Sequence, residues 1–160
     1  MKKPPALAAH ATGIVTVLSV DPIIEDHAVL EEIFSGSPWS LCPGCRWELK
    51  TSATLLSAWT VLHRYRIPIV LCEYDLSPGT WRELLWQLDS LSEPPYLIVA
   101  SRRADESLWA EALNLGAYDV LAKPFDRTEV TRVVSLAWLH WKEQHGVIPE
   151  KRLARAGGSI

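Results

Sequence analysis

The chain has 160 residues, of which 48% are hydrophobic and 22% charged, and its formal net charge at pH 7 is −3. A chain of this length and composition is expected to fold as one globular domain with a substantial core. The weakly acidic balance gives no electrostatic reason to expect nucleic acid as a partner. No apolar run approaches the roughly 18 residues that a membrane-spanning helix needs. We therefore expect a protein that binds neither nucleic acid nor membrane.

The two ends of the chain differ from the part between them. Residues 1–12 contain two lysines and two prolines without a sustained apolar core, so they predict a flexible tail and not a signal peptide. We expect one domain over residues 13–145 and a basic tail over residues 146–160. The three cysteines are too few for a disulfide framework, which is typical of a reducing cytosol, and we expect a cytoplasmic protein.

Five short segments predict five strands, and the first, third, fourth and fifth are mainly apolar and are followed by polar residues. The predicted strands cover residues 14–20, 47–50, 69–72, 96–101 and 118–121. The third of them, with the sequence IVLC, has the continuous apolar character of a strand that is buried on both faces. Such strands are typical of a parallel sheet covered by helices.

A helix is predicted after each strand, because apolar residues recur there at helical spacing. The first helix follows Pro22 and includes Val29 to Phe34, and the second is capped by Thr51 or Ser52. A capping box of Thr80 and Glu83 begins the third helix, which extends to about Leu91. Asp105 caps the fourth helix, which stops at Gly116, and Asp126 begins the last helix, which extends to about His145. The repeated strand–helix alternation predicts a flavodoxin-like (βα)5 fold. This is a doubly wound parallel sheet in a single domain of three layers.

Polar side chains follow four of the predicted strands. They are Asp21, Glu73, Ser101 and Lys123, after the first, third, fourth and fifth strands. Because the carboxyl ends of parallel strands meet at one edge of a sheet, we expect these side chains to lie close together. Carboxylates suit Mg²⁺, and a lysine with a hydroxyl suits phosphate oxygens. The structural alternative is a buried ion pair of Lys123 with Glu73 or Asp21 that only ties the loops together.

Four motifs, VLSVD, VLCEYDLSPG, IVAS and GAYDVLAKPF, together resemble the receiver domain of two-component response regulators. The resemblance covers about residues 14–142, and the last motif is its most specific part. It implies a cis peptide bond between Lys123 and Pro124. It also implies that Glu73 stands at the phospho-accepting aspartate, and that Ser101 and Lys123 stand at the residues that contact the phosphoryl group.

The resemblance also identifies a departure from the Mg²⁺ site of the family. Asp21 falls at one of two acids near the first strand, whereas Pro22 falls at the other, so one ligand is missing. Glu73 and the backbone carbonyl of Asp75 would complete the set. Since Mg²⁺ demands near-octahedral oxygen geometry, we expect no cofactor, or at most a weakened Mg²⁺ site.

Glutamate is longer than aspartate by one C–C bond, about 1.5 Å, and an error near 1 Å can slow a reaction about 100-fold. We therefore predict a pseudo-receiver, a non-enzymatic stand-alone module of a two-component phosphorelay that binds proteins without being phosphorylated. Its partner would be a histidine kinase or another regulator. Two versions stay open: Glu73 reaches towards Lys123 and Ser101 and holds an active-like state, or the site is inert. A receiver that is phosphorylated at a non-standard acid is a further alternative.

Cys42 and Cys45 form a Cys-x-x-Cys motif, which supports a different class of function. Such a pair serves redox chemistry or supplies half of a zinc site. The pair lies in a loop, and zinc would need two more ligands, for example from a second chain. Cys72 is expected in the core. The alternative prediction is a small redox or zinc-binding α/β protein.

The last predicted helix is apolar around much of its circumference, and such a helix requires burial on more than one side. Its inward stripe includes Trp141, whereas Trp138 falls off the stripe. Since exposed apolar patches mark interaction sites, we expect an interface that includes Trp109, Trp138 and Trp141, with a homodimer through the last helix. The alternative is that the helix packs under the C-terminal tail.

Overall fold

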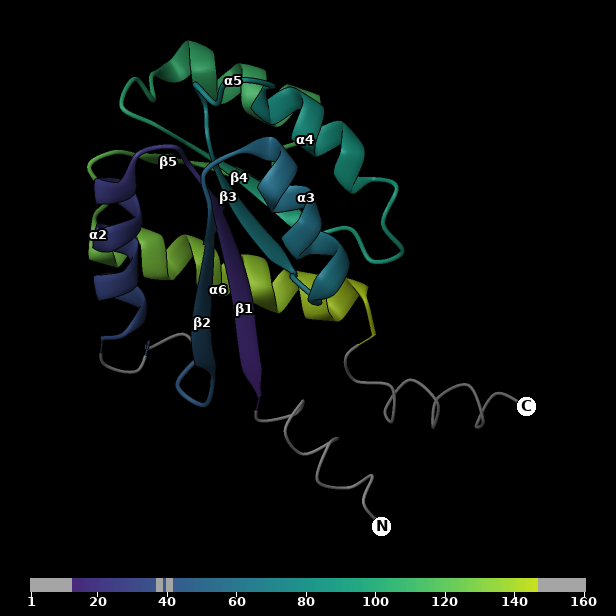
Figure 1. Cartoon of the computed structure of the whole chain (residues 1–160). Coiled ribbons are helices and arrows are strands. Elements are labelled where there is room, and N and C mark those ends of the chain that lie inside the picture. The colour runs from purple at the N-terminus through teal and green to yellow at the C-terminus, as the bar shows by residue number, and fades with distance from the viewer. Residues whose placement is uncertain (1–12, 37–38, 40–41, 147–160) are drawn as a thin grey trace.

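The structure, a computed structural model, describes residues 13–36, 39 and 42–146, so the predicted tails at 1–12 and 147–160 lie outside the described residues. Strands and helices alternate along this part of the chain (Figure 1). The elements are β1 (Ile14–Val20), α2 (Ile24–Phe34), β2 (Arg46–Ser52), α3 (Leu55–Arg64), β3 (Ile69–Glu73), α4 (Trp81–Leu88), β4 (Tyr96–Ser101), α5 (Glu106–Leu115), β5 (Asp119–Ala122) and α6 (Arg127–Gln144).

All five strands belong to one parallel sheet with the order β2-β1-β3-β4-β5. This is the flavodoxin-like order, so the predicted fold class is confirmed. The strand order reverses between β1 and β3, which are neighbours in the sheet although β2 lies between them in the sequence. Helices therefore leave these two strands towards opposite faces, and their carboxyl ends border the region where doubly wound folds bind ligands.

Helices cover both faces of the sheet and give the predicted three layers (Figure 1). One face packs against α3, α4 and α5 around Trp81 and Leu84, and the other packs against α2 and α6 around Leu30 and Val134. Every residue of β3 is buried, as its apolar sequence predicts. No helix in the described part of the chain is both long and apolar enough to cross a bilayer.

Four of the predicted helix signals are found where the sequence places them. The Thr80 hydroxyl accepts a hydrogen bond from the backbone N–H of Glu83, whose side chain accepts one from the backbone N–H of Thr80. Asp105 caps α5 by accepting a hydrogen bond from the backbone N–H of Leu108, and Asp126 caps α6 by accepting one from the backbone N–H of Glu129. Gly116 ends α5 with a φ of 116°, a left-handed conformation that glycine adopts at little cost. The Lys123–Pro124 peptide bond is cis, as the resemblance implies.

The cap predicted for α3 is wrong by two or three residues. Thr54, and not Thr51 or Ser52, accepts the capping hydrogen bond from the backbone N–H of Ser57. The reason is that β2 is longer than its apolar residues suggest, since it pairs with β1 along its whole length as far as Ser52. Polar residues continue this edge strand because backbone pairing does not depend on side-chain polarity.

Candidate functional site

The four predicted site residues lie at the carboxyl ends of four neighbouring strands. Asp21 follows β1 directly, Glu73 ends β3, Ser101 ends β4, and Lys123 follows β5. All four are at least nine-tenths buried. Asp21 and Glu73 flank the point at which the strand order reverses. The expectation that the parallel topology gathers these residues at one edge is therefore met.

The Lys123 ammonium group is the centre of the site. Its Nζ donates to Asp21 Oδ2 at 2.6 Å, to Asp26 Oδ2 at 2.7 Å, and to Glu73 Oε1. The lysine side chain is fully buried, and none of the three carboxylate side chains is more than 8% exposed. Burial of these charges is tolerated because the ammonium group uses all three of its donors on carboxylates.

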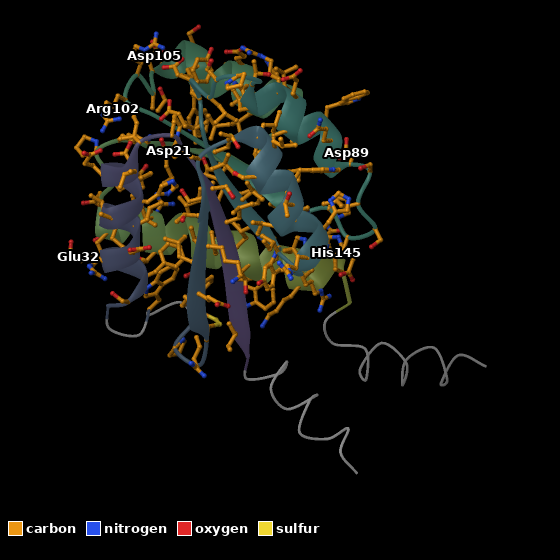
Figure 2. All side chains as sticks on the ribbon, viewed as in Figure 1. Asp21, Glu32, Asp89, Arg102, Asp105 and His145 are labelled. Carbon is orange, nitrogen blue, oxygen red and sulfur yellow. A yellow bond between two sulfur atoms is a disulfide. The ribbon has the colours of Figure 1, made fainter. Side chains whose placement is uncertain are left out.

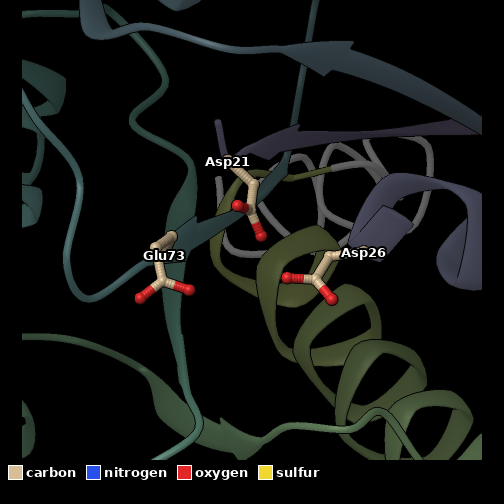
Figure 3. A group of neighbouring side chains, drawn as sticks. All are labelled: Asp21, Asp26 and Glu73. Atoms are coloured by element: carbon tan, nitrogen blue, oxygen red, sulfur yellow. The ribbon is translucent and has the colours of Figure 1, made fainter. Parts of the chain in front are cut away.

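Asp26 is the site residue that the sequence analysis missed. It lies in the first turn of α2, five residues after Asp21. One oxygen from each of Asp21, Asp26 and Glu73 lies within 4.8 Å of the others, and Figure 3 shows the three carboxylates around a common region. We call these three residues the carboxylate cluster. The acid that is absent at Pro22 is thus supplied by Asp26, which corrects the inference that the cluster is one acid short. An acid in a first helical turn is too common to have singled Asp26 out.

Arg102 covers the outer side of Asp26. Its Nη2 donates to Asp26 Oδ1 at 3.0 Å and its Nη1 to Asp26 Oδ2 at 3.2 Å, a bidentate ion pair between residues that are 76 positions apart. Figure 2 shows Arg102 and Asp21 at the same side of the molecule. Burial by itself would raise the pKa of Asp26, but the hydrogen bonds from Arg102 and Lys123 outweigh it and hold this pKa below its usual value.

The electrostatics of Lys123 follow the same pattern. Burial by itself would lower its pKa, but the hydrogen bonds to Asp21, Asp26 and Glu73 outweigh burial and raise the pKa above its usual value. The lysine is therefore charged at neutral pH, and the site contains a fixed positive charge among its acids.

Backbone amides occupy the remaining carboxylate oxygens. The N–H of Ile23 donates to Asp21 Oδ1 at 2.9 Å, and the N–H of Asp75 donates to Glu73 Oε2 at 2.8 Å. Together with the bonds from Lys123 and Arg102, these amides give every one of the six oxygens of the carboxylate cluster a donor from the chain itself. The cluster is a closed hydrogen-bonded unit.

The Ser101 hydroxyl and the Asp75 carboxylate make their contacts outside the carboxylate cluster. The Ser101 hydroxyl accepts a hydrogen bond from the backbone N–H of Arg103 at 3.0 Å. The Asp75 carboxylate forms an exposed ion pair with Arg103 at 3.1 Å. Glu73 reaches Lys123 as the sequence analysis proposed, but no hydrogen bond joins Glu73 to Ser101 in the part of the chain that the structure describes.

The residues of the carboxylate cluster fit a divalent cation in chemistry but not in arrangement. Three carboxylates are hard oxygen ligands of the kind that Mg²⁺ prefers, and Mg²⁺ binds such oxygens at about 2.0–2.1 Å in an octahedron. Each oxygen here already accepts a hydrogen bond, and the Lys123 ammonium group lies between the acids. A cation bound between the three acids would have to displace the Lys123 ammonium group, so we derive no chemical step through Mg²⁺.

Cys42 and Cys45 form a disulfide with a Cα–Cα distance of 5.5 Å. They lie between α2 and β2, next to Arg46, which pairs with Ile14 at the amino end of β1. The disulfide therefore lies near the amino ends of β1 and β2, whereas the carboxylate cluster lies at the carboxyl ends of the strands. Among the described residues, neither cysteine belongs to a group of three or more metal-ligating side chains. Cys72 is buried as predicted, and burial raises the pKa of its thiol.

The three tryptophans predicted for an interface differ in accessibility. Trp109 on α5 is 48% exposed, and Trp138 on α6 is partly buried. Trp141 is only 1% exposed, and its indole N–H donates to the carbonyl of Pro94 at 3.0 Å. The inclusion of Trp141 among the interface residues is therefore wrong, because this side chain faces the interior of the domain. Trp86, which was not predicted, is 77% exposed on α4.

Comparison with protein-family models and with curated proteins finds no match. Solved structures do match. A signal receiver domain of an HD domain-containing protein from Pseudomonas fluorescens Pf-5 has 21% identity and a TM-score of 0.63, with 81% of this chain and 98% of that chain covered. A CheY-like response regulator receiver domain protein from Methanospirillum hungatei JF-1 has 17% identity and a TM-score of 0.65, with coverage of 82% and 99%.

A third similar structure is the beryllofluoride-activated NtrC4 receiver domain dimer, with 20% identity and a TM-score of 0.62. The match covers 79% of this chain and 98% of that chain. At these identities the likeness establishes the CheY-type fold. It leaves the chemistry of the site to the residues of this chain.

Proposed function

We propose that this chain is a receiver-like signalling module of a two-component pathway that acts by binding proteins and is not phosphorylated at Glu73. The fold it shares with receiver domains supports this proposal, as does the position of Asp21, Glu73 and Lys123 at one edge of the sheet. The partner would be a histidine kinase or another regulator, in the cytoplasm. Receiver domains are in general signalling modules and not enzymes.

The observation that carries the proposal is the state of the Glu73 carboxylate. Oε1 accepts a hydrogen bond from Lys123, and Oε2 accepts one from the backbone N–H of Asp75. A nucleophile needs a lone pair directed at the reacting atom, and a misplacement of about 1 Å is already enough to slow the reaction about 100-fold. Glu73 has both oxygens engaged and a side chain one methylene longer than aspartate. Both features disfavour attack on a phosphoryl donor.

Intact mass spectrometry after incubation with Mg²⁺ and acetyl phosphate tests this proposal. We expect no phosphate adduct on the native protein, whereas a receiver domain with an aspartate acceptor, treated in parallel, should gain one. A stoichiometric adduct that maps to Glu73 would contradict the proposal. An adduct at Asp75 or Asp26 would instead support phosphorylation at a non-standard acid.

Hydrogen exchange distinguishes the active-like state from the inert site. If the Glu73–Lys123 contact holds α5, β5 and α6 in one state, the Glu73→Gln variant should exchange its amides faster over residues 105–144. If the site is inert, the increase should stay within the residues next to Glu73. The same comparison made with Asp75→Asn controls for the loss of an acid at the surface, because the Asp75 carboxylate is exposed and pairs with Arg103 outside the carboxylate cluster.

Self-association through α6 is part of the proposal. Trp138 is the accessible member of the Trp138–Trp141 stack, whose ring centroids are 5.9 Å apart. We expect light scattering to give the mass of a dimer for the native chain and of a monomer for Trp138→Glu. Trp86→Glu, at an exposed residue of α4 on the opposite face of the sheet, is the control. Equal masses for the native and Trp138 variants would count against this interface.

The Cys42–Cys45 disulfide favours a second candidate function, in redox chemistry. Thiol titration under native conditions, before and after treatment with a dithiol reductant, tests it. A disulfide that reduces and re-forms reversibly, with a defined potential, supports this candidate. A pair that stays reduced after exposure to glutathione disulfide argues against it. Metal analysis of the reduced protein tests whether two chains share one zinc ion through these cysteines.

A further inference from the structure

The carboxylate cluster has three acids within reach of one another, although Pro22 stands where the resemblance places an acid. A shortage of acids therefore cannot explain an absence of Mg²⁺ binding. The arrangement of donors offers a different explanation, because all six carboxylate oxygens accept hydrogen bonds from the chain. Four of these oxygens accept hydrogen bonds from the side chains of Lys123 and Arg102.

We infer that Arg102, together with Lys123, takes the place of a divalent cation at the carboxylate cluster and keeps Mg²⁺ out of it. This inference deepens the proposed function, on which its meaning for signalling rests. It assigns the exclusion of metal mainly to Arg102, which is not one of the four site residues predicted from the sequence. It also replaces the sequence-based reason, the missing acid at Pro22.

The charges support this assignment. The three carboxylates carry three negative charges, and the Lys123 ammonium and Arg102 guanidinium groups carry two positive charges, the same as one Mg²⁺ ion. Asp26 Oδ2 accepts from both cations, so the two positive groups share one carboxylate. An entering Mg²⁺ would meet a cluster that is already largely neutralised, and it would be repelled by both cations.

Arg102 is the cation that controls access, since the two groups differ in position. The Lys123 side chain is fully buried beneath the acids, whereas the Arg102 side chain is 53% exposed and covers the outer oxygens of Asp26. Removing the guanidinium group would free Asp26 Oδ1 completely and leave the core intact. Arg103 provides a matched control: its side chain is 68% exposed and pairs with Asp75 outside the cluster.

Binding of Mn²⁺ tests the inference, because Mn²⁺ takes the same carboxylate ligands as Mg²⁺. The electron paramagnetic resonance signal of free Mn²⁺ decreases as the ion binds, so it measures the affinity directly. We compare the native chain with Arg102→Ala, Arg103→Ala and the double variant Arg102→Ala/Asp26→Asn. Arg102→Ala should bind Mn²⁺ at least about tenfold more tightly than the native chain, which corresponds to about 1.4 kcal/mol. Arg103→Ala should bind like the native chain, and the double variant should lose the gain.

Each other outcome overturns the inference. If the native chain binds Mn²⁺ as tightly as Arg102→Ala, Arg102 does not exclude the cation. If Arg102→Ala and Arg103→Ala gain equally, the effect is a general one of net charge. If Arg102→Ala fails to fold by circular dichroism, Arg102→Gln, which removes the charge but keeps part of the aliphatic stem, is measured instead; a gain of about tenfold supports the inference, and no gain overturns it.

The metal test and the phosphorylation test can fail separately. A native chain that excludes Mn²⁺ but forms a phosphate adduct would contradict the proposed function and leave this inference standing. If the native chain forms no adduct and Arg102→Ala gains no Mn²⁺ affinity, this inference is contradicted and the proposed function stands.

Discussion

Replacement of Lys123 by methionine should destabilise the fold strongly at neutral pH. The Lys123 ammonium group contacts all three acids of the carboxylate cluster, and none of their side chains is more than 8% exposed. Removal of one partner from a buried ion pair costs about 3–5 kcal/mol, because the remaining charge is left without compensation. For a domain of this size, that loss lowers the melting temperature by roughly 10–20 °C.

The pH dependence of this loss provides a stringent test. The raised pKa of Lys123 means that its stabilising contribution is fully present below the ordinary lysine pKa of about 10.4 and disappears only as the pH rises through the higher folded value. The native chain therefore has this contribution at both pH 7 and pH 4. In Lys123→Met, lowering the pH from 7 to 4 reduces the repulsion between the acids, so the stability difference from the native chain should be smaller at pH 4.

Urea unfolding followed by circular dichroism at pH 7 and pH 4 measures both effects. Lys142→Met is the control, because the Lys142 ammonium group lies 5.8 Å from the centre of the Trp138 ring and forms no ion pair with another described residue. It should change the unfolding free energy by less than about 0.5 kcal/mol. Adding Glu73→Gln to Lys123→Met should restore part of the lost stability, because it removes one of the uncompensated charges. A loss below about 1 kcal/mol, or an equal loss at both pH values, would refute this account of the site.

Three further predictions concern other parts of the structure. Thr80→Ala should lower the unfolding free energy by about 1 kcal/mol, because it removes the cap that accepts from the backbone N–H of Glu83; an unchanged urea midpoint would argue against the capping box. Iodoacetamide at pH 8 should leave Cys72 unmodified until the protein unfolds, since burial raises the pKa of its thiol, and mass spectrometry of the native protein checks this. The lowered pKa of Asp26 means that its contribution is present above the unfolded pKa of about 3.9 and is lost as the pH falls through the lower folded value. Asp26→Asn should therefore flatten the acid limb of the stability curve, and a limb of unchanged slope would contradict the role of Arg102 as its partner.

Much of the candidate site could be predicted because it depends on topology. The strand–helix alternation required a parallel sheet, and a parallel sheet places the ends of β1, β3, β4 and β5 at one edge. Asp21, Glu73 and Lys123 therefore had to lie near one another. The cis bond at Pro124 came only from the resemblance, since the residues themselves state no more than that such a bond is permitted at proline.

The misplaced predictions concern residues whose partners are far away in the sequence. Trp141 was included in an interface because helical periodicity does not tell how many sides of α6 are covered, and the covering carbonyl belongs to Pro94, 47 residues away. Asp26 was not predicted at all, and its partners Arg102 and Lys123 lie 76 and 97 positions away.

Local patterning by itself determined the order of the elements, the caps at Thr80, Asp105 and Gly116, and the acidic edge of the sheet, because each depends on residues within a few positions of one another or on the alternation of strands and helices. Only the tertiary structure decided that Asp26 completes the carboxylate cluster and that Arg102 covers it. Those two residues are 76 positions apart, and the choice of partner among many surface charges is made by distance in space, which no periodicity in the chain encodes.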